Sequence, residues 1–265
     1  MPKLHFGTIG WSYNFWKGNF YPAKTASKDF LAFYSKQFNT VEVDATFYRN
    51  PTEQTVQNWH DATPKGFTFS LKFPQLITHI LMLRNCQPQT DAFLHSIEGL
   101  KEKLGPLLLQ FPPNFAANHF QDLAAYLQKL PKQHRYVVEI RNKSWLTQEF
   151  FSLLRENKVV LAWADSALMA EVREVTGDFL YMRWEGDRKA VVGTVGKVEV
   201  DKTVDYQRWT DRLKPYLEGT EVFGYFAKYY SGFPPHDIES LSHLLGVSAK
   251  TSDAAVSSFQ TQLSS

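Results

Sequence analysis

Short apolar runs recur along the chain and alternate with stretches that have a longer hydrophobic period. The runs are rich in β-branched, leucine and aromatic residues, which is typical of buried strands. Eight of them are predicted as strands: 4–11, 40–47, 67–73, 106–111, 135–141, 159–165, 179–185 and 220–227. Between most runs, apolar residues recur every three or four positions, which predicts helices. Helical stretches include 27–38, 90–104, 118–130, 147–157 and one around 205–217.

The repetition of strand then helix indicates parallel βαβ units. Eight units favour a TIM-barrel-like (β/α)8 fold of the α/β class over an open doubly wound sheet. A chain of 265 residues fits one such domain, which we assign to residues 1–248. The Gly-rich, charged stretch 186–203 predicts a loop inserted after the seventh strand. Residues 249–265, rich in Ser, Thr, Ala and Gln, are predicted to form a tail or terminal helix.

Composition limits the compartment and the partners. Twenty-nine basic and 27 acidic residues give a net charge of +2, which lacks the basic excess of a dedicated nucleic-acid binder. Cys86 is the only cysteine, so no intrachain disulfide forms and a reducing cytoplasmic location is expected. The first residues show no secretory signal and no run approaches a membrane span, so we expect no membrane partner.

Polar residues occur at or near the end of every predicted strand. In the run 40–47, apolar and polar positions alternate, which places Glu42 and Asp44 on one strand face. The others, in strand order, are Trp11, Lys72, Gln110, Glu139 with Arg141, Asp165, Arg183 with Glu185, and Lys228. A parallel barrel gathers these strand ends on one face, which predicts a site there, with Tyr48 leaving its rim.

Buried charges need partners of opposite sign, so a barrel interior predicts a network that joins the carboxylates to the cations. We predict Glu42 or Glu139 as general base and His79 as proton carrier, with Asp165 as a further catalytic candidate. The predicted substrate-binding residues are Trp11, Tyr13, Asp44, Tyr48, Lys72, Gln110, Arg141, Arg183, Glu185 and Lys228. The alternative is a purely structural ion-pair network that plugs the barrel mouth.

The loop 10–22 packs six aromatic residues into "GWSYNFWKGNFYP". Such rings can stack on sugars or bases, and Trp11 and Tyr13 are the best placed to do so. The alternative is a hydrophobic lid over the barrel.

No motif for a nucleotide cofactor is present. The sequence contains no GxGxxG fingerprint, and "GTVGKV" at 193–198 lacks the first glycine and the Ser or Thr of a P-loop. The histidines show no metal-ligand spacing. The carboxylates leave a site for Mg²⁺ or Mn²⁺ open, so the cofactor stays undetermined.

The succession "GWSYNFWKGNFYP", "FNTVEVDATFYRNPTEQTVQNWHDATPKGFTFSLKFPQLITH", "LGPLLLQFPPNF" and "VVEIRNKSW" resembles the YecE-like family, domain of unknown function 72. The resemblance implies a TIM-barrel-like fold and no defined reaction. The family pattern falls on Trp11, Tyr13, Glu42, Phe47, Tyr48, Lys72, Thr78, His79, Gln110, Pro112, Glu139, Arg141, Trp145 and Arg183. Members of this family are distantly similar to the barrel of endonuclease IV, which suggests phosphodiester chemistry by analogy of fold alone.

This sequence departs from the family pattern at two places. Glu185 stands where many members have His, and "FAK", ending at Lys228, replaces a Phe-Asn-Asn run. Asp44 stands where Asn is common. An added carboxylate and an added lysine compensate each other or, alternatively, mark a metal-binding variant.

Three functions follow as hypotheses. The preferred one is an enzyme, a hydrolase or isomerase, that acts on a small anionic, phosphorylated or sugar-like substrate. The second is a nucleic-acid binding or endonuclease IV-like processing protein. The third is a non-catalytic binding barrel whose mouth is sealed by side chains.

Overall fold

The computed structural model describes residues 3–167, 169 and 172–248. Within these residues, the strands form two parallel sheets. The strands are β1 (Lys3–Thr8), β2 (Thr40–Val43), β3 (Thr68–Lys72), β4 (Leu104–Gln110), β5 (Tyr136–Glu139), β6 (Val160–Leu161), β7 (Trp163–Ser166), β8 (Phe179–Gly186) and β9 (Glu221–Phe226). One sheet has the order β1-β9-β8-β7 and the other β2-β3-β4-β5-β6. The predicted tail, 249–265, lies outside the described residues.

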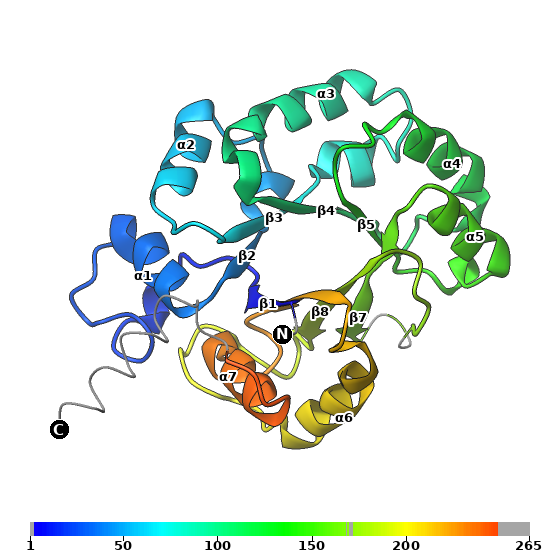
Figure 1. The fold of residues 1–265 in the computed structure, drawn as a ribbon. Coiled ribbons are helices and arrows are strands. Elements are labelled where there is room, and N and C mark those ends of the chain that lie inside the picture. Colours follow the sequence, from blue (N-terminus) through cyan, green and yellow to red (C-terminus); the bar gives the residue numbers. More distant parts are fainter. Residues whose placement is uncertain (1–2, 168, 170–171, 249–265) are drawn as a thin grey trace.

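Helices connect the strands and lie on the outside of both sheets (Figure 1). They are α1 (Phe30–Gln37), α2 (Glu53–Asp61), α3 (Gln87–Ser96), α4 (Phe120–Lys129), α5 (Gln148–Glu156), α6 (Thr203–Leu213) and α7 (Pro234–Leu244). In α5, for example, the Thr147 side chain caps the helix by accepting from the Phe150 amide at 3.2 Å, and one face buries Phe150 and Leu154. No helix of the described ranges combines the length and apolar character needed to cross a lipid bilayer.

All eight predicted strand regions contain a strand, but the sixth is divided. β6 pairs with β5 in one sheet and β7 pairs with β8 in the other. Ala162 lies between them, and its amide bonds to the Val138 carbonyl at 2.9 Å. The chain therefore changes sheets at this residue. On the other side, Ile9 and Glu42 form a single parallel bridge between the two sheets.

Alternate strand residues pack in opposite directions. Leu107 and Leu109 belong to the large core against the helices, whereas Leu108 belongs to an inner cluster. That inner cluster draws side chains from both sheets: Ile9, Leu108, Val137, Val160, Ala162, Phe179, Tyr181, Phe223 and Tyr225. The two sheets thus share one apolar interior.

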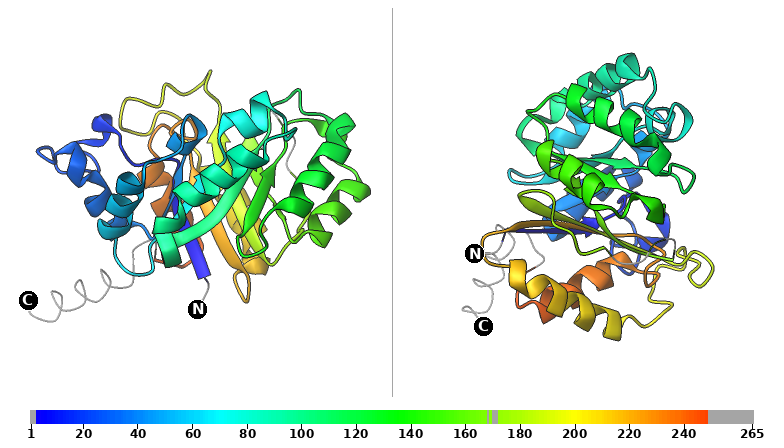
Figure 2. Two further views of the ribbon diagram at one scale, coloured as in Figure 1. Left: turned by 90° about the horizontal axis from the view of Figure 1, so that it is seen from above. Right: turned by 90° about the vertical axis from the view of Figure 1, so that its right-hand side faces the viewer.

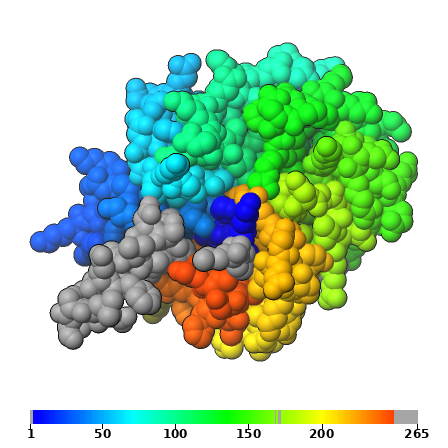
Figure 3. Space-filling view, in the orientation of Figure 1, coloured from blue at the N-terminus to red at the C-terminus, as the bar shows by residue number. Residues whose placement is uncertain are grey.

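Charged and aromatic side chains contact one another at the end of the strands where β1 begins. Figure 3 shows the first residues of β1, in dark blue, at the middle of this face. Glu221 accepts from His5 at 2.9 Å and pairs with Arg135 at 2.9 Å. The Arg135 guanidinium lies 4.1 Å above the Phe179 ring. A ligand site is therefore more easily accommodated at the opposite, carboxyl ends of the strands.

The predicted insertion after the seventh strand is confirmed as a loop. Residues 187–202 contain no helix or strand, and in the left view of Figure 2 this loop rises on the side away from the N-terminus. Asn19 holds it from the first loop by donating to the Gly196 carbonyl at 2.9 Å. The loop therefore stands beside the carboxyl ends of the strands.

The buried carboxyl of Asp237 makes stability depend on pH. Tyr206 donates to its Oδ1 at 2.5 Å, and Oδ2 has no hydrogen-bond partner in the described structure. Burial raises the pKa of Asp237 to about 7. The folded state then binds more protons than the unfolded state between about pH 4 and pH 7, so the free energy of unfolding falls as pH rises through that window.

Asp237→Asn keeps the acceptor for Tyr206 and removes the charge. We expect the variant to be about 1–3 kcal/mol more stable than the parent at pH 8 and to lose part of the pH dependence. Urea unfolding at pH 5 and pH 8 measures both quantities, with the exposed Asp178→Asn as control. An unchanged pH slope in Asp237→Asn would contradict this account.

Candidate functional site

A cavity of about 300 Å³ lies at the carboxyl ends of the strands. Its lining consists mostly of charged and polar side chains. The lining residues are Ile9, Tyr13, Asp44, Tyr48, Lys72, Gln110, Arg141, Arg183, Glu185, Arg188, Ala227, Lys228 and Tyr229. Five of these are cationic and two are acidic, so the wall that a ligand meets is predominantly positive.

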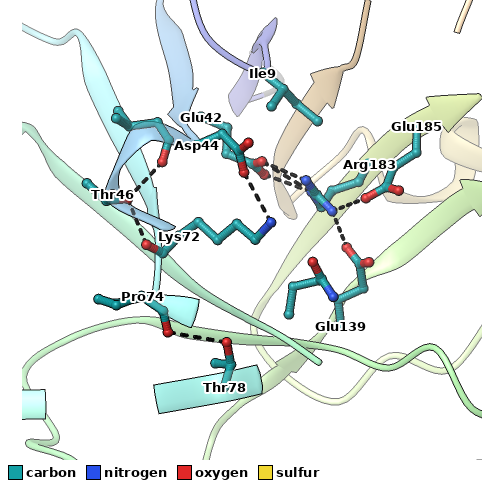
Figure 4. Close-up of polar contacts among 12 residues, drawn as sticks. Ile9, Glu42, Asp44, Thr46, Lys72, Pro74, Thr78, Glu139, Arg183 and Glu185 are labelled. Atoms are coloured by element: carbon teal, nitrogen blue, oxygen red, sulfur yellow. Dashed lines mark hydrogen bonds and ion pairs between the residues drawn. The ribbon is translucent and has the colours of Figure 1, made fainter. Parts of the chain in front are cut away.

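Arg183, near the end of β8, is the centre of the site (Figure 4). Its Nε and Nη2 donate to Glu42 of β2 at 3.0 and 2.9 Å, and its Nη1 donates to Glu139 of β5 at 2.5 Å. The same Nη1 contacts Glu185 on its own strand. The Arg183 side chain is 3% exposed, whereas Glu42 and Glu139 are 0% and 2% exposed. Three strands are therefore joined through one buried guanidinium.

A second arginine extends the network toward the cavity. Arg141 donates from Nε to Glu139 at 2.9 Å and from Nη2 to Glu185 at 2.5 Å. Glu185 therefore receives hydrogen bonds from two guanidinium groups and faces the cavity between them. Its carboxylate neutralises part of the positive charge of both arginines.

The two innermost carboxyls differ in their acidity. Burial raises the pKa of Glu42, against the opposing effect of Arg183. Burial also opposes ionisation of Glu139, but the charges of Arg183 and Arg141 together outweigh it and lower the pKa of Glu139 to about 2. Glu139 has two cationic neighbours where Glu42 has one, which accounts for the difference. Tyr181 completes the shell of Glu42 by donating to it at 2.7 Å.

On the β2–β3 side, Lys72 and Asp44 form the other polar pair. The Lys72 ammonium lies 3.1 Å from Asp44 Oδ1 and 4.0 Å above the Phe47 ring. Thr46 fixes the backbone between them by donating to the carbonyls of Val43 and Lys72 at 2.9 and 2.7 Å. Asp44 leaves the strand just after Val43, and its side chain is 37% exposed. Both partners line the cavity and can meet a ligand.

The predicted site residues separate into three groups. Nine of the predicted binding residues do line the cavity: Tyr13, Asp44, Tyr48, Lys72, Gln110, Arg141, Arg183, Glu185 and Lys228. Glu42 and Glu139 contact Arg183 and do not line the cavity themselves. Trp11, His79 and Asp165 lie outside the cavity lining.

Packing explains the position of each residue in the third group. Trp11 meets the rings of Trp59 and Phe69 edge-on. Asp165 accepts from the side chains of Arg208 and Trp209 on α6 at 2.9 and 2.7 Å, so it faces the outer helix.

His79 lies in a π-helical turn, Leu76–Ile80, and its Nδ1 is 2.9 Å from the Thr78 hydroxyl. Its ring packs edge-on against Phe47, with centroids 4.9 Å apart. Burial, with Lys72 and Arg141 nearby, lowers the pKa of His79 to about 4. The imidazole is therefore neutral at pH 7.

The aromatic loop 10–22 is largely committed to packing. Trp16 and Tyr21 are fully buried, and Phe20 stacks on Phe38 with centroids 5.5 Å apart. Tyr13 is the member of this loop whose ring reaches the cavity, and its hydroxyl donates to the Ile9 carbonyl at 2.6 Å.

Sequence reasoning did not identify Arg188 and Tyr229 as site residues. Both line the cavity, and the Arg188 guanidinium lies 4.9 Å from the Tyr229 ring. For Arg188, the insertion at 186–203 carried the relevant signal, because a charged loop at a strand's carboxyl end contributes side chains to a site there. Tyr229 lies in the segment that follows β9, next to the predicted Lys228.

No group of three or more His, Cys, Asp or Glu side chains suited to a metal occurs in the described ranges. The carboxylates of Glu42, Glu139 and Glu185 instead converge on one guanidinium. The Arg183 guanidinium thus supplies the positive charge between these three carboxylates.

These features define the chain as an α/β protein with parallel strands and a charged cavity at the strands' carboxyl ends. The family model described as "Protein of unknown function DUF72" matches residues 5–261. The chain therefore belongs to the DUF72 family, and the resemblance seen in its motifs is confirmed.

Two curated relatives carry the UPF0759 designation. The chain is 32% identical over 115 residues to UPF0759 protein YecE of Escherichia coli (strain K12), which covers 43% of this chain and 42% of YecE. It is 31% identical over 157 residues to UPF0759 protein YunF of Bacillus subtilis (strain 168), which covers 56% of this chain and 54% of YunF. The match thus spans about half the length of these relatives.

Solved structures of the family share the fold. A DUF72 family protein from Thermotoga maritima MSB8 superimposes with a TM-score of 0.71 at 24% identity, covering 90% of this chain and 96% of that one. Another from Enterococcus faecalis V583 gives 0.71 at 18% identity, covering 94% and 99%. At these identities the likeness concerns the fold alone.

Proposed function

We propose that the two parallel sheets belong to one (β/α)8 barrel in a single domain. Three observations support this. The strands follow the cyclic order of such a barrel once β6 and β7 are counted as one. The Ile9–Glu42 bridge joins the sheets on one side and Ala162 on the other. The inner apolar cluster contains residues from both sheets. In this fold, active sites occur at the carboxyl ends of the strands.

We further propose that the chain is an enzyme that transfers protons on a small anionic, sugar-like or phosphorylated substrate. The observation that carries this proposal is a cavity of about 300 Å³ lined by five cations and two carboxylates. That volume is at the lower end of small-molecule sites and suits a compact, polar ligand. The positive wall attracts anions, and the mixture of donors and acceptors matches hydroxyl groups.

Asp44 and Lys72 are the proposed proton-transfer pair. They face the cavity 3.1 Å apart, so Asp44 can accept a proton while Lys72 stabilises negative charge that develops on the substrate. Arg141 and Glu185 bind and orient polar groups of the substrate. Glu42 and Glu139 act through Arg183, which they hold in place.

The test measures proton exchange. Phosphorylated and unphosphorylated sugars are incubated with the protein in D₂O, and NMR follows deuterium incorporation and conversion. We expect turnover of a phosphorylated or acidic sugar by the parent protein and none by Lys72→Met. Lys189→Met, a change at an exposed lysine, serves as control. Absence of exchange and conversion across the panel, with a folded protein, would overturn the enzyme proposal.

A further inference from the structure

The cations of the cavity differ in whether a carboxylate neutralises them. Lys72 pairs with Asp44, and Arg141 and Arg183 pair with the glutamates. Lys228 and Arg188 line the same cavity, and neither forms an ion pair with a described residue. Two positive charges on one side of the cavity therefore lack a counter-charge from the part of the chain that the structure describes.

The surroundings of Lys228 are aromatic. Its ammonium lies 5.0 Å from the centroid of Tyr229 and 5.8 Å from those of Tyr13 and Phe15. The ring faces attract the cation but provide no carboxylate or carbonyl oxygen for its three N–H donors. Lys228 is half-buried, so its ammonium is also partly removed from water. An anion in the cavity would supply the missing acceptors.

The backbone that carries Lys228 is fixed by the inserted loop. A Cβ on Gly186, which has φ +71°, would meet the Tyr229 carbonyl oxygen at 2.1 Å. A Cβ on Gly193, which has φ +70°, would meet the Lys228 carbonyl oxygen at 2.9 Å. The loop therefore packs directly on the Lys228–Tyr229 main chain, which is possible because these positions are glycine.

Glu199 holds the loop in that place. Its carboxylate accepts from the Val192 and Gly193 amides at 2.9 and 2.8 Å, and its own amide donates to the Ser231 carbonyl at 2.7 Å. Arg188 is carried on this loop, which packs against Tyr229 at Gly186 and bonds to Ser231 at Glu199, both in the segment that follows β9. The backbone that carries both cations, which have no ion-pair partner among the described residues, is thus held in place, which reduces the ordering cost of binding an anion.

We propose that Lys228 and Arg188 form a subsite for a phosphate group of the substrate, separate from the reacting part held by Asp44 and Lys72. This inference rests on the proposed function and specifies its substrate class as phosphorylated. Two cations without counter-charges match a dianion better than a monoanionic carboxylate. The Glu185 carboxylate, which neutralises the arginines, directs the phosphate to the Lys228 side of the cavity.

Binding of inorganic phosphate tests the subsite without any knowledge of the reaction. Isothermal titration compares phosphate with acetate for the parent, Lys228→Gln, Lys228→Arg and Arg188→Gln. We expect the parent to bind phosphate more tightly than acetate. Lys228→Gln should weaken phosphate binding about 10- to 100-fold. Arg188→Gln should weaken it less, because Arg188 is exposed. Lys228→Arg keeps the charge and should retain most of the affinity. Lys189→Gln, at an exposed neighbour of Arg188, should bind like the parent.

The outcomes separate this inference from the proposed function. Equal binding of phosphate by Lys228→Gln and parent, equal binding of acetate and phosphate by the parent, or no phosphate binding at all would each overturn the subsite. The enzyme proposal would still stand if the deuterium-exchange assay found turnover. Thermal unfolding of Lys228→Gln checks the fold, and we expect no loss of Tm because a half-buried cation without a counter-charge is removed.

Discussion

Replacement of Arg183 by methionine is expected to lower the free energy of unfolding by about 3–5 kcal/mol at pH 7. The reason is that Glu42 and Glu139, 0% and 2% exposed, would lose the guanidinium that they share. Arg141 would still neutralise Glu139, whereas Glu42 would retain only the Tyr181 hydroxyl among its present charged and hydroxyl partners. Urea unfolding at pH 7 measures the loss.

The pH dependence of that loss distinguishes electrostatics from packing. In Arg183→Met the pKa of each buried carboxyl rises, so protonation removes the charge as pH falls toward the carboxyls' ordinary range. The difference from the parent should therefore shrink at pH 4. The double variant Arg183→Met/Glu42→Gln should recover part of the stability at pH 7, because it no longer buries the Glu42 charge. Arg188→Met, a change at an exposed arginine, serves as the control for loss of a guanidinium. An equal loss at pH 7 and pH 4 would show that the ion pairs are not responsible.

Asp44→Asn is expected to reduce kcat about 100- to 10,000-fold on the substrate found in the exchange assay. The amide occupies the same space but cannot accept a proton. Asp44 is 37% exposed, so the change should cost about 1 kcal/mol of stability or less. Initial-rate kinetics with a thermal unfolding control measures both effects.

Two further variants make this result specific to Asp44. Glu218→Gln removes an exposed carboxylate elsewhere and should leave kcat unchanged. Glu185→Gln should raise KM more than it lowers kcat, because Glu185 orients rather than transfers a proton in this proposal. A kcat in Asp44→Asn close to that of the parent would exclude Asp44 as the proton acceptor.

One cavity brings together the three residues that differ from the pattern on which the family resemblance rests. Asp44, Glu185 and Lys228 come from the ends of β2, β8 and β9, and each lines the same pocket. Asp44 pairs with Lys72 and Glu185 pairs with two arginines, whereas Lys228 has no ion-pair partner in the described ranges. The compensation expected between an added carboxylate and Lys228 is therefore not seen as a direct ion pair. The three side chains instead place two negative charges and one positive charge around one cavity.

The positions of the local elements follow from the pattern of apolar and polar residues along the chain. Apolar runs and three- to four-residue periods are local properties, so they predicted each strand region and the loop after β8. The alternation in 40–47 placed Glu42 and Asp44 on one strand face, and only the assignment of this run as the second of eight strands predicted that the face points inward; Glu42 is 0% exposed. The end of each strand was less certain, because Asp44 and Ile9 leave their strands where the turn begins.

The identity of the polar residues that share a site depends on how the strands assemble. Glu42 and Arg183 are 141 positions apart in sequence, and no local period links them. Asp165 and Glu185 each follow a run of apolar residues, but Asp165 faces α6 while Glu185 faces the cavity. The side-chain direction at a strand end depends on the partners that the neighbouring strand and helix supply. Charge pairing is a property of three-dimensional proximity, so only the fold reveals that Lys228 has no ion-pair partner among the described residues.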